Sequence, residues 1–169
     1  MILLKFLMNF IKVLNEEAGP RAIAAGAALG AVIGLTPKGS PHNLVILALF
    51  FFLNVNGSAG AFAAAVFTLF AYLGDPLFNK IGYDLLTAGP LRGFWTALYN
   101  TPAVPWTRFN NTLVLGSLVS SLILFWPLYF GGTWAVLKYR ERVLSAVQKW
   151  KIMQAIKASK LAAFLHGYL

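Results

Sequence analysis

Three long stretches of this chain contain no charged residue, and they constrain its fold more than any other feature. Asp, Glu, Lys and Arg are absent from residues 22–37, 39–74 and 109–137. A helix needs roughly 18–20 apolar residues to cross a bilayer, and the last two stretches exceed that length. Hydrophobic residues make up 59% of the chain and charged residues 11%, which is atypical of soluble domains. The sequence therefore predicts an all-α integral membrane protein.

Both ends of the chain have the pattern of helices that lie on a membrane surface. The first twelve residues alternate apolar side chains with Lys5 and Lys12 and precede no small-residue cleavage site. This pattern predicts a retained interfacial N-terminal helix rather than a signal peptide. Residues 138–169 are predicted to form a basic amphipathic cytoplasmic helix. We therefore divide the chain into a membrane domain, residues 1–137, and this helix, residues 138–169.

The charge of the C-terminal helix predicts how the protein is oriented. Lys and Arg are enriched in the cytoplasmic flanks of transmembrane helices, where anionic lipid headgroups attract them. We expect a multi-pass protein of the bacterial inner membrane with both termini in the cytoplasm. We expect the basic residues to contact the membrane surface, not nucleic acid. They are Lys138, Arg140, Arg142, Lys149, Lys151, Lys157 and Lys160.

A run of small residues predicts a first short helix over residues 22–36. Gly26, Gly30 and Gly34 recur every four residues, so they form one stripe where another helix can approach closely. We interpret this stripe as a helix-packing surface. The helix is expected to end near Thr36, because a residue that precedes a proline disfavours the helical conformation.

A second short helix is predicted over residues 41–53, with Ser40 as its N-cap and Pro41 at its first position. The two short helices would be roughly 20–24 Å long, against about 30 Å of hydrocarbon. Two arrangements are therefore open. The pair forms either a re-entrant hairpin or two full spans of a thinned bilayer, and the arrangements differ in where Lys38 lies.

Two longer transmembrane helices are predicted downstream. Ser58 is the expected cap of the first, over residues 58–73, and Asn110 or Asn111 caps the second, over 112–137. Asp75 and Pro76 are expected to begin a separate, more polar helix outside the membrane. A weak echo between residues 22–53 and 58–86 leaves an inverted repeat, as in transporters, as an alternative.

The polar segment TPKGSPHN, residues 36–43, is the candidate binding site. Backbone N–H groups and the helix dipole at the start of helix 41–53 favour an anion, and within a membrane that anion is a lipid phosphate. The predicted headgroup ligands are Lys38, Gly39, Ser40, His42 and Asn43. The alternative is a plain turn in which Lys38 is an anchoring charge.

Catalytic and metal-binding patterns are missing from the sequence. The chain has no cysteine, and its two histidines, His42 and His166, are far apart, so no metal or cofactor is predicted. Lys38 precedes Gly39, which is the reverse of a phosphate-binding P-loop. Nothing in the spacing brings Asp84 near His42 or Lys38 as an acid–base pair. We therefore expect a protein that is not an enzyme.

The order of these motifs resembles a known bacterial family. The segments PRAIAAGAALGAVIGLTPKGSPHNL, YLGDPL and RFNNTLVLGSLV are similar to the domain-of-unknown-function family twenty sixty-two, in its small gammaproteobacterial branch, over about residues 15–145. The resemblance implies a small inner-membrane protein with a role in envelope biogenesis or lipid handling. It implies no catalytic residue.

From these observations we expect a membrane subunit that recognises or helps to move an anionic lipid in the cell envelope. A chain of this size has little surface for a complete transport path, so a larger envelope partner or a homo-oligomer is expected. Two alternatives stay open. One is an autonomous transporter or flippase of a phosphate-bearing lipid, and the other is a purely structural membrane anchor.

Overall fold

The computed structural model describes residues 18–149, with side chains described as far as residue 142. The predicted interfacial helix at the N-terminus and residues 150–169 of the predicted C-terminal helix lie outside this range. The described part is helical and contains no strand. Its elements are α2 (Pro20–Leu35), α3 (His42–Phe52), α4 (Gly57–Thr87), η1 (Gly89–Leu91), α5 (Arg92–Tyr99), η2 (Val104–Thr107) and α6 (Thr112–Lys149).

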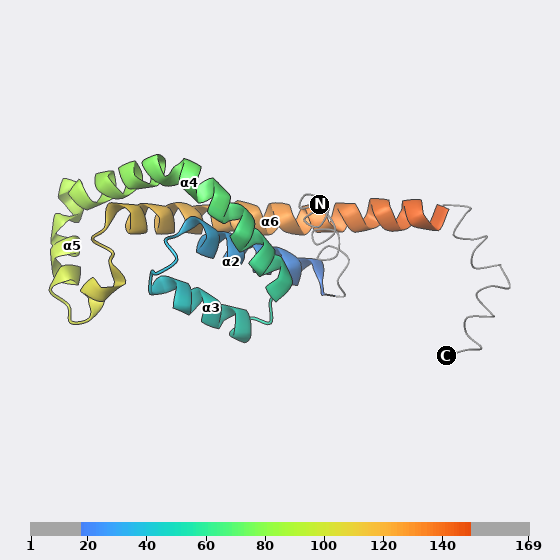
Figure 1. The fold of residues 1–169 in the computed structure, drawn as a ribbon, viewed down its shortest axis with the longest axis horizontal. Helices are drawn as coiled ribbons and strands as arrows, with labels where there is room; N and C mark the ends of the chain where they lie inside the picture. Colours follow the sequence, from blue (N-terminus) through green and yellow to red (C-terminus); the bar gives the residue numbers. More distant parts are fainter. Residues whose placement is uncertain (1–17, 150–169) are drawn as a thin grey trace.

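Helix α2 is the core of the bundle. It packs between the two long helices α4 and α6, and α3 lies alongside it (Figure 1). Ten of its sixteen residues are buried, although the helix consists largely of Ala and Gly. Small side chains let neighbouring backbones approach α2 closely, so an apolar helix with little side-chain volume can still be well packed.

The close approaches occur at the predicted glycine stripe. A Cβ atom on Gly30 would lie 2.7 Å from the carbonyl carbon of Gly60, and one on Gly34 would lie 2.8 Å from the carbonyl oxygen of Ala64. Gly26 lies against the backbone of Asn56 in the same way. All three glycines therefore face the first half of α4.

A second close approach joins α4 to α6, and the sequence did not reveal it. A Cβ on Gly82 would lie 2.6 Å from the carbonyl carbon of Thr112, and one on Gly116 would lie 2.7 Å from that of Phe78. The two glycines come from different helices, so no periodic pattern links them in the sequence. Together they let the start of α6 contact the second half of α4.

The prediction of a break at Asp75 was wrong, because α4 is one helix of 31 residues that continues through this point to Thr87. Pro76 lies inside the helix, which is bent in Figure 1. An internal proline removes one hydrogen bond and bends a helix without necessarily ending it. The contacts of Gly82 and Gly116 hold the second half of α4 against α6 beyond the bend. The predicted echo between residues 22–53 and 58–86 is therefore absent, since the second segment has no turn.

The start of α4 also differs from the prediction. Asn56, not Ser58, is the N-cap, and its side-chain oxygen accepts a hydrogen bond of 2.6 Å from the backbone N–H of Ala59. The backbone N–H of Asn56 also donates to Ala22 O, over 3.0 Å. Helices α2 and α4 thus begin at the same level. On α6 the predicted cap is confirmed, because Asn111 Oδ1 accepts from the N–H of Val114 over 3.1 Å.

The three central helices have fixed relative directions. Along α2, successive glycines meet successively later residues of α4, so α2 and α4 are parallel. Arg140 on α6 donates a 3.0 Å hydrogen bond to Ala18 O just before α2, whereas Leu113 lines the same cavity as Thr36 at the end of α2. Helix α6 is therefore antiparallel to α2, and α2 crosses the bundle from one end of the apolar region to the other.

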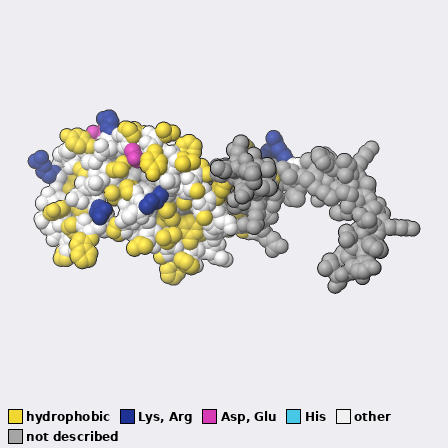
Figure 2. Space-filling view, viewed as in Figure 1, with side chains coloured by type: hydrophobic (Ala, Val, Ile, Leu, Met, Phe, Trp, Pro, Cys, Tyr) yellow, Lys and Arg dark blue, Asp and Glu magenta, His cyan; other side chains and the backbone are white. Residues whose placement is uncertain are grey.

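The outer surface of the bundle is apolar to a degree that is unusual for a soluble monomer. Phe51, Phe52 and Leu73 are 86%, 83% and 80% exposed, and many other large apolar side chains on α3, α4 and α6 are exposed with them. Hydrophobic side chains are prominent on the face in Figure 2, and charges on it are few. By length and composition, α4 and the Thr112–Arg142 part of α6 are long and apolar enough to cross a membrane.

Candidate functional site

The turn between α2 and α3 is held together by its own polar side chains. The Thr36 hydroxyl lies 2.8 Å from Val32 O and 2.9 Å from Asn43 Oδ1, and both are acceptors that share its single proton. The Asn43 side-chain N–H donates to Pro37 O over 3.0 Å. Thr36, Ser40 and Asn43 are all buried. These contacts join the end of α2 to the first turn of α3 and fix the conformation of the segment between them.

Helix α3 begins one residue later than predicted. It starts at His42, with Pro41 as N-cap and no side-chain capping bond, so Ser40 does not cap it. The N–H of Ser40 donates to Pro37 O over 3.1 Å, and that of Asn43 donates to Ser40 O over 3.0 Å. Two of the backbone N–H groups that the predicted anion site required are therefore used inside the turn.

Lys38 binds the carboxyl end of α2. Its ammonium donates to Ile33 O over 2.9 Å and to Gly34 O over 2.8 Å. The last carbonyls of a helix lack helical donors and carry partial negative charge, so a cation there is favourable. Partial burial lowers the pKa of Lys38 from its ordinary value of 10.5.

The structure does not gather the five predicted headgroup ligands around one ligand-facing surface. Ser40 and Asn43 are buried within the turn, and Gly39 is exposed. His42 lines a separate cavity of about 300 Å³, whose other lining residues are mostly apolar. Of the five, Lys38 lines a second cavity, which lies beside the middle of α4.

A polar hollow lies where the α2–α3 turn, the middle of α4 and the start of α6 meet. It consists of two adjoining cavities of about 190 and 440 Å³, which share the lining residues Tyr72, Asp75 and Leu113. We call this pair of cavities the polar hollow. Its polar lining residues are Thr36, Lys38, Thr68, Tyr72, Asp75, Asn79, Asn111 and Thr112.

Helix α4 contributes one continuous polar stripe to the hollow. Thr68, Tyr72, Asp75 and Asn79 are spaced at i, i+4, i+7 and i+11, which places them on one helix face. The sequence contained this signal, but the predicted break at Asp75 concealed it. The Asn79 side chain also contacts the Thr112 hydroxyl, which closes one edge of the hollow against α6.

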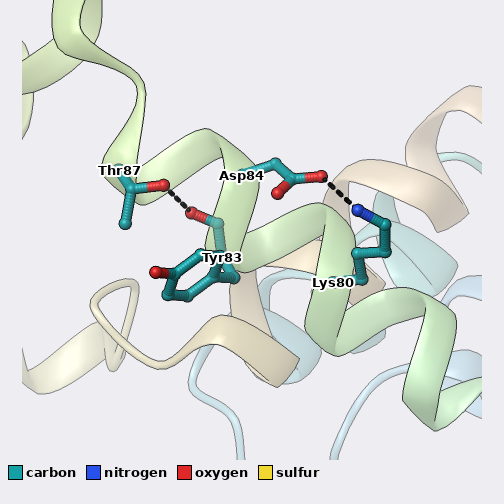
Figure 3. Close-up of polar contacts among 4 residues, drawn as sticks. All are labelled: Lys80, Tyr83, Asp84 and Thr87. Carbon is teal, nitrogen blue, oxygen red and sulfur yellow. Dashed lines mark hydrogen bonds and ion pairs between the residues drawn. The ribbon is translucent and has the colours of Figure 1, made fainter.

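Asp75 and Asp84 lie on the same helix in different environments. Asp84 is exposed and pairs with Lys80 over 3.2 Å on the helix surface (Figure 3). Asp75 is half-buried in the hollow and makes no ion pair with any residue that the structure describes. Its carboxylate is therefore available to a ligand, and Asp84 provides a matched comparison.

The basic residues of α6 lie at the opposite end of the bundle from the hollow. Lys138 pairs with Glu141 over 3.9 Å, and Arg140 binds Ala18 O. Arg142 is exposed. Helix α6 runs without interruption through the predicted domain boundary at residues 137 and 138. The side chain of Lys149 and the residues Lys151, Lys157 and Lys160 lie outside what the structure describes.

The fold and the site define a class of protein. Residues 18–149 form a helical protein in which two helices are suited to membrane crossing and a hollow with polar lining residues lies where α2, α4 and α6 meet. Within residues 18–149, no group of three or more His, Cys, Asp or Glu residues is arranged to hold a metal.

Comparison with known proteins places the chain in a bacterial family. Residues 5–144 match the family described as "Uncharacterized protein conserved in bacteria (DUF2062)", and the chain belongs to that family. An uncharacterized protein of Treponema pallidum (strain Nichols) is 27% identical over 159 residues, which cover 94% of this chain and 98% of the relative. No solved structure matches the chain. The predicted family is thus confirmed.

Proposed function

We propose that this protein is a non-enzymatic component of the bacterial inner membrane that binds the phosphate of a lipid headgroup in the polar hollow. The observation that carries the proposal is the position of Lys38, a cation that lines a cavity together with Thr68, Tyr72 and Asp75 of the otherwise apolar helix α4. Phosphate oxygens are strong acceptors for an ammonium donor. Lys38 lines the smaller of the two cavities, about 190 Å³, and the adjoining cavity of about 440 Å³ is within the usual size of small-molecule sites.

In the proposed topology, the hollow lies at the depth of the lipid headgroups in the membrane. It includes Thr112, the first residue of α6, and the turn that follows α2. Helix α6 then continues as an apolar helix away from this level. Exposed apolar side chains of α4, such as Leu69 and Leu73, provide contacts for acyl chains below a bound headgroup.

The directions of the helices support four membrane traverses over a re-entrant hairpin. Since α2 runs parallel to α4 from a common starting level, α3 returns the chain to that level before α4 begins. A re-entrant turn would instead lie halfway along the apolar part of α6, whereas the α2–α3 turn lies beside Leu113, near the start of α6. In the proposed topology both termini are cytoplasmic, and the polar hollow, α5 and the rest of residues 75–108 are at the periplasmic face.

Three exposed glycines allow this topology to be tested in a chain without cysteine. A Cβ at Gly19, Gly39 or Gly93 meets no atom within 4 Å, so cysteine fits at each site. Four traverses predict that Gly39→Cys and Gly93→Cys react with an impermeant thiol reagent from the periplasm. Gly19→Cys is expected to react only after the cells are opened. Protection of Gly39→Cys from periplasmic reagent, with Gly93→Cys labelled, would refute this topology.

Phosphate binding is tested by native mass spectrometry of the full chain in detergent with added phospholipids. Lys38→Gln is expected to weaken binding of phosphatidylglycerol about tenfold, the effect of losing one charge-assisted hydrogen bond. Lys80→Gln removes an exposed lysine of α4 outside the hollow and serves as the matched control. Equal lipid binding by both variants and the unmodified protein contradicts the proposal.

A structural anchor is the second candidate function, and one observation favours it. Lys38 already binds two helix carbonyls, and the turn around it satisfies many of its own polar groups. On this hypothesis, Lys38→Gln lowers the free energy of unfolding but leaves lipid binding and cellular function unchanged. Comparing unfolding with lipid affinity in this variant therefore separates the two functions.

The exposed apolar faces of α3, α4 and α6 are also candidate surfaces for binding a protein partner. Lipid covers such faces in a membrane, and the same faces allow packing against a larger envelope subunit or a second copy of the chain. We propose that the protein acts within such an assembly in lipid handling. Cross-linking in intact membranes, followed by mass determination of the products, distinguishes a homo-oligomer from a complex with another subunit.

A further inference from the structure

The two sides of the polar hollow carry opposite chemistry. The α2–α3 turn contributes a donor, the Lys38 ammonium, and α4 contributes acceptors around Asp75. An anion-specific site contains donors and cations and avoids carboxylates, because like charges repel within a partly buried site. The presence of Asp75 is therefore unexplained by a ligand that carries only phosphate.

The acceptors on α4 extend beyond the Asp75 carboxylate. Pro76 has no N–H, so the carbonyl four residues earlier, on Tyr72, has no helical donor. Tyr72 and Asp75 both line each of the two cavities. A carboxylate and a backbone carbonyl within one helical turn form a suitable environment for a primary ammonium, which has three N–H groups to donate.

We propose that the polar hollow binds a zwitterionic group in which a phosphate and a primary ammonium are joined by a short linker. Lys38 binds the phosphate, and Asp75, with the Tyr72 carbonyl, binds the ammonium. This inference rests on the proposed function and adds the identity of the headgroup class. The chemistry is that of phosphoethanolamine, either as the headgroup of a membrane phospholipid or as a soluble molecule.

Two features favour the lipid over the soluble form. The exposed side chains of Leu69 and Leu73 lie on the same helix as Asp75 and offer apolar surface beside the hollow. Tyr72 lines the hollow and is itself 74% exposed, so it borders both the hollow and the outer surface of the bundle. A soluble phosphoethanolamine would leave the apolar surface without a partner.

The test compares headgroups on the full-length protein in detergent by native mass spectrometry. The probes are phosphatidylethanolamine, phosphatidylglycerol without an amine, and phosphatidylcholine, whose ammonium has no N–H. We expect phosphatidylethanolamine to bind about tenfold more tightly than either of the others. Asp75→Asn should abolish that preference while leaving phosphatidylglycerol binding unchanged or stronger. Asp84→Asn, the matched acid on the same helix, should retain the preference.

A competition experiment decides whether the ligand is a lipid headgroup or a soluble molecule. Soluble phosphoethanolamine at millimolar concentration should not displace bound phosphatidylethanolamine if the acyl chains contribute to binding. Displacement at that concentration would assign the hollow to the soluble molecule and overturn the lipid form of the proposal.

The binding data distinguish a protein that does not prefer a zwitterionic headgroup from one that does not bind phosphate in the hollow. Equal binding of the three lipids by the unmodified protein, weakened by Lys38→Gln, overturns the zwitterionic ligand and retains phosphate binding. Lipid binding that is insensitive to Lys38→Gln overturns both. If Asp75→Asn does not fold, as judged by circular dichroism, the ranking of lipids by the unmodified protein still decides the question.

Discussion

The glycine-mediated contact between α2 and α4 predicts a large effect of one added methyl group. In Gly30→Ala, the Cβ would lie 2.7 Å from the carbonyl carbon and 2.8 Å from the Cα of Gly60, whereas ordinary contact begins at 3.4 Å. The obstructing atoms belong to the backbone, so no side chain can rotate away. Relief requires that α2 and α4 separate, which loosens packing along the most buried helix of the bundle.

The expected cost of Gly30→Ala follows from overpacking. Forcing an extra methyl group into a well-packed core costs about 1–3 kcal/mol. Gly131→Ala is the control, because its Cβ meets nothing within 4 Å and alanine favours a helix over glycine by about 0.5–1 kcal/mol. The two variants should therefore shift the free energy of unfolding in opposite directions.

The assay is unfolding of the purified protein in mixed micelles with increasing sodium dodecyl sulfate, followed by tryptophan fluorescence. Gly30→Ala should unfold at lower detergent fraction and Gly131→Ala at equal or higher fraction. Similar shifts for both variants would refute the contact between α2 and α4, since helix propensity alone would then account for the data.

Three further predictions concern single interactions. Thr36→Val should destabilise by about 1–3 kcal/mol in the same unfolding assay, because it leaves buried Asn43 without its hydroxyl partner, whereas Thr36→Ser should be close to neutral. Asn56→Ala should cost about 1 kcal/mol through loss of the α4 cap, and Ser58→Ala, at the position that the sequence suggested, should cost much less. Partial burial lowers the pKa of Lys38 in the folded state, so between that pKa and 10.5 the unfolded chain binds more protons than the folded protein. The free energy of unfolding should therefore rise with pH toward 10.5. Lys38→Gln should remove that rise in alkaline unfolding titrations; persistence of the full rise would assign it to another group.

The sequence predicted those elements whose boundaries depend on local chemistry. Pro37 ends α2 at Leu35, and the helix from Thr112 is capped by Asn111, as expected. The apolar lengths also identified both long helices that are suited to membrane crossing. In each case the determining residues lie within one helical turn of the boundary.

The largest error occurred where tertiary contacts override a local pattern. Asp75 and Pro76 match the pattern of a helix start, yet α4 continues through them because Gly82 and Gly116 hold its second half against α6. The hydrogen bond lost at Pro76 is outweighed by this packing. The same error hid the polar hollow, since Tyr72 and Asp75 share a face only if the helix is continuous. A sequence pattern cannot reveal this, because the contacts join Gly82 to Thr112 and Gly116 to Phe78, which are far apart in the sequence.

The contacts of Lys38 explain how one residue can stabilise the fold and also bind a ligand. An ammonium has three N–H donors, and two of them bind the carbonyls of Ile33 and Gly34. The third is left for an acceptor in the hollow. Fixing a free lysine side chain costs about 1.5–2 kcal/mol of conformational entropy. Because the α2 carbonyls already hold Lys38 in place, a phosphate that binds there does not incur that cost again, which favours binding at this turn over binding to a lysine whose side chain is free to move.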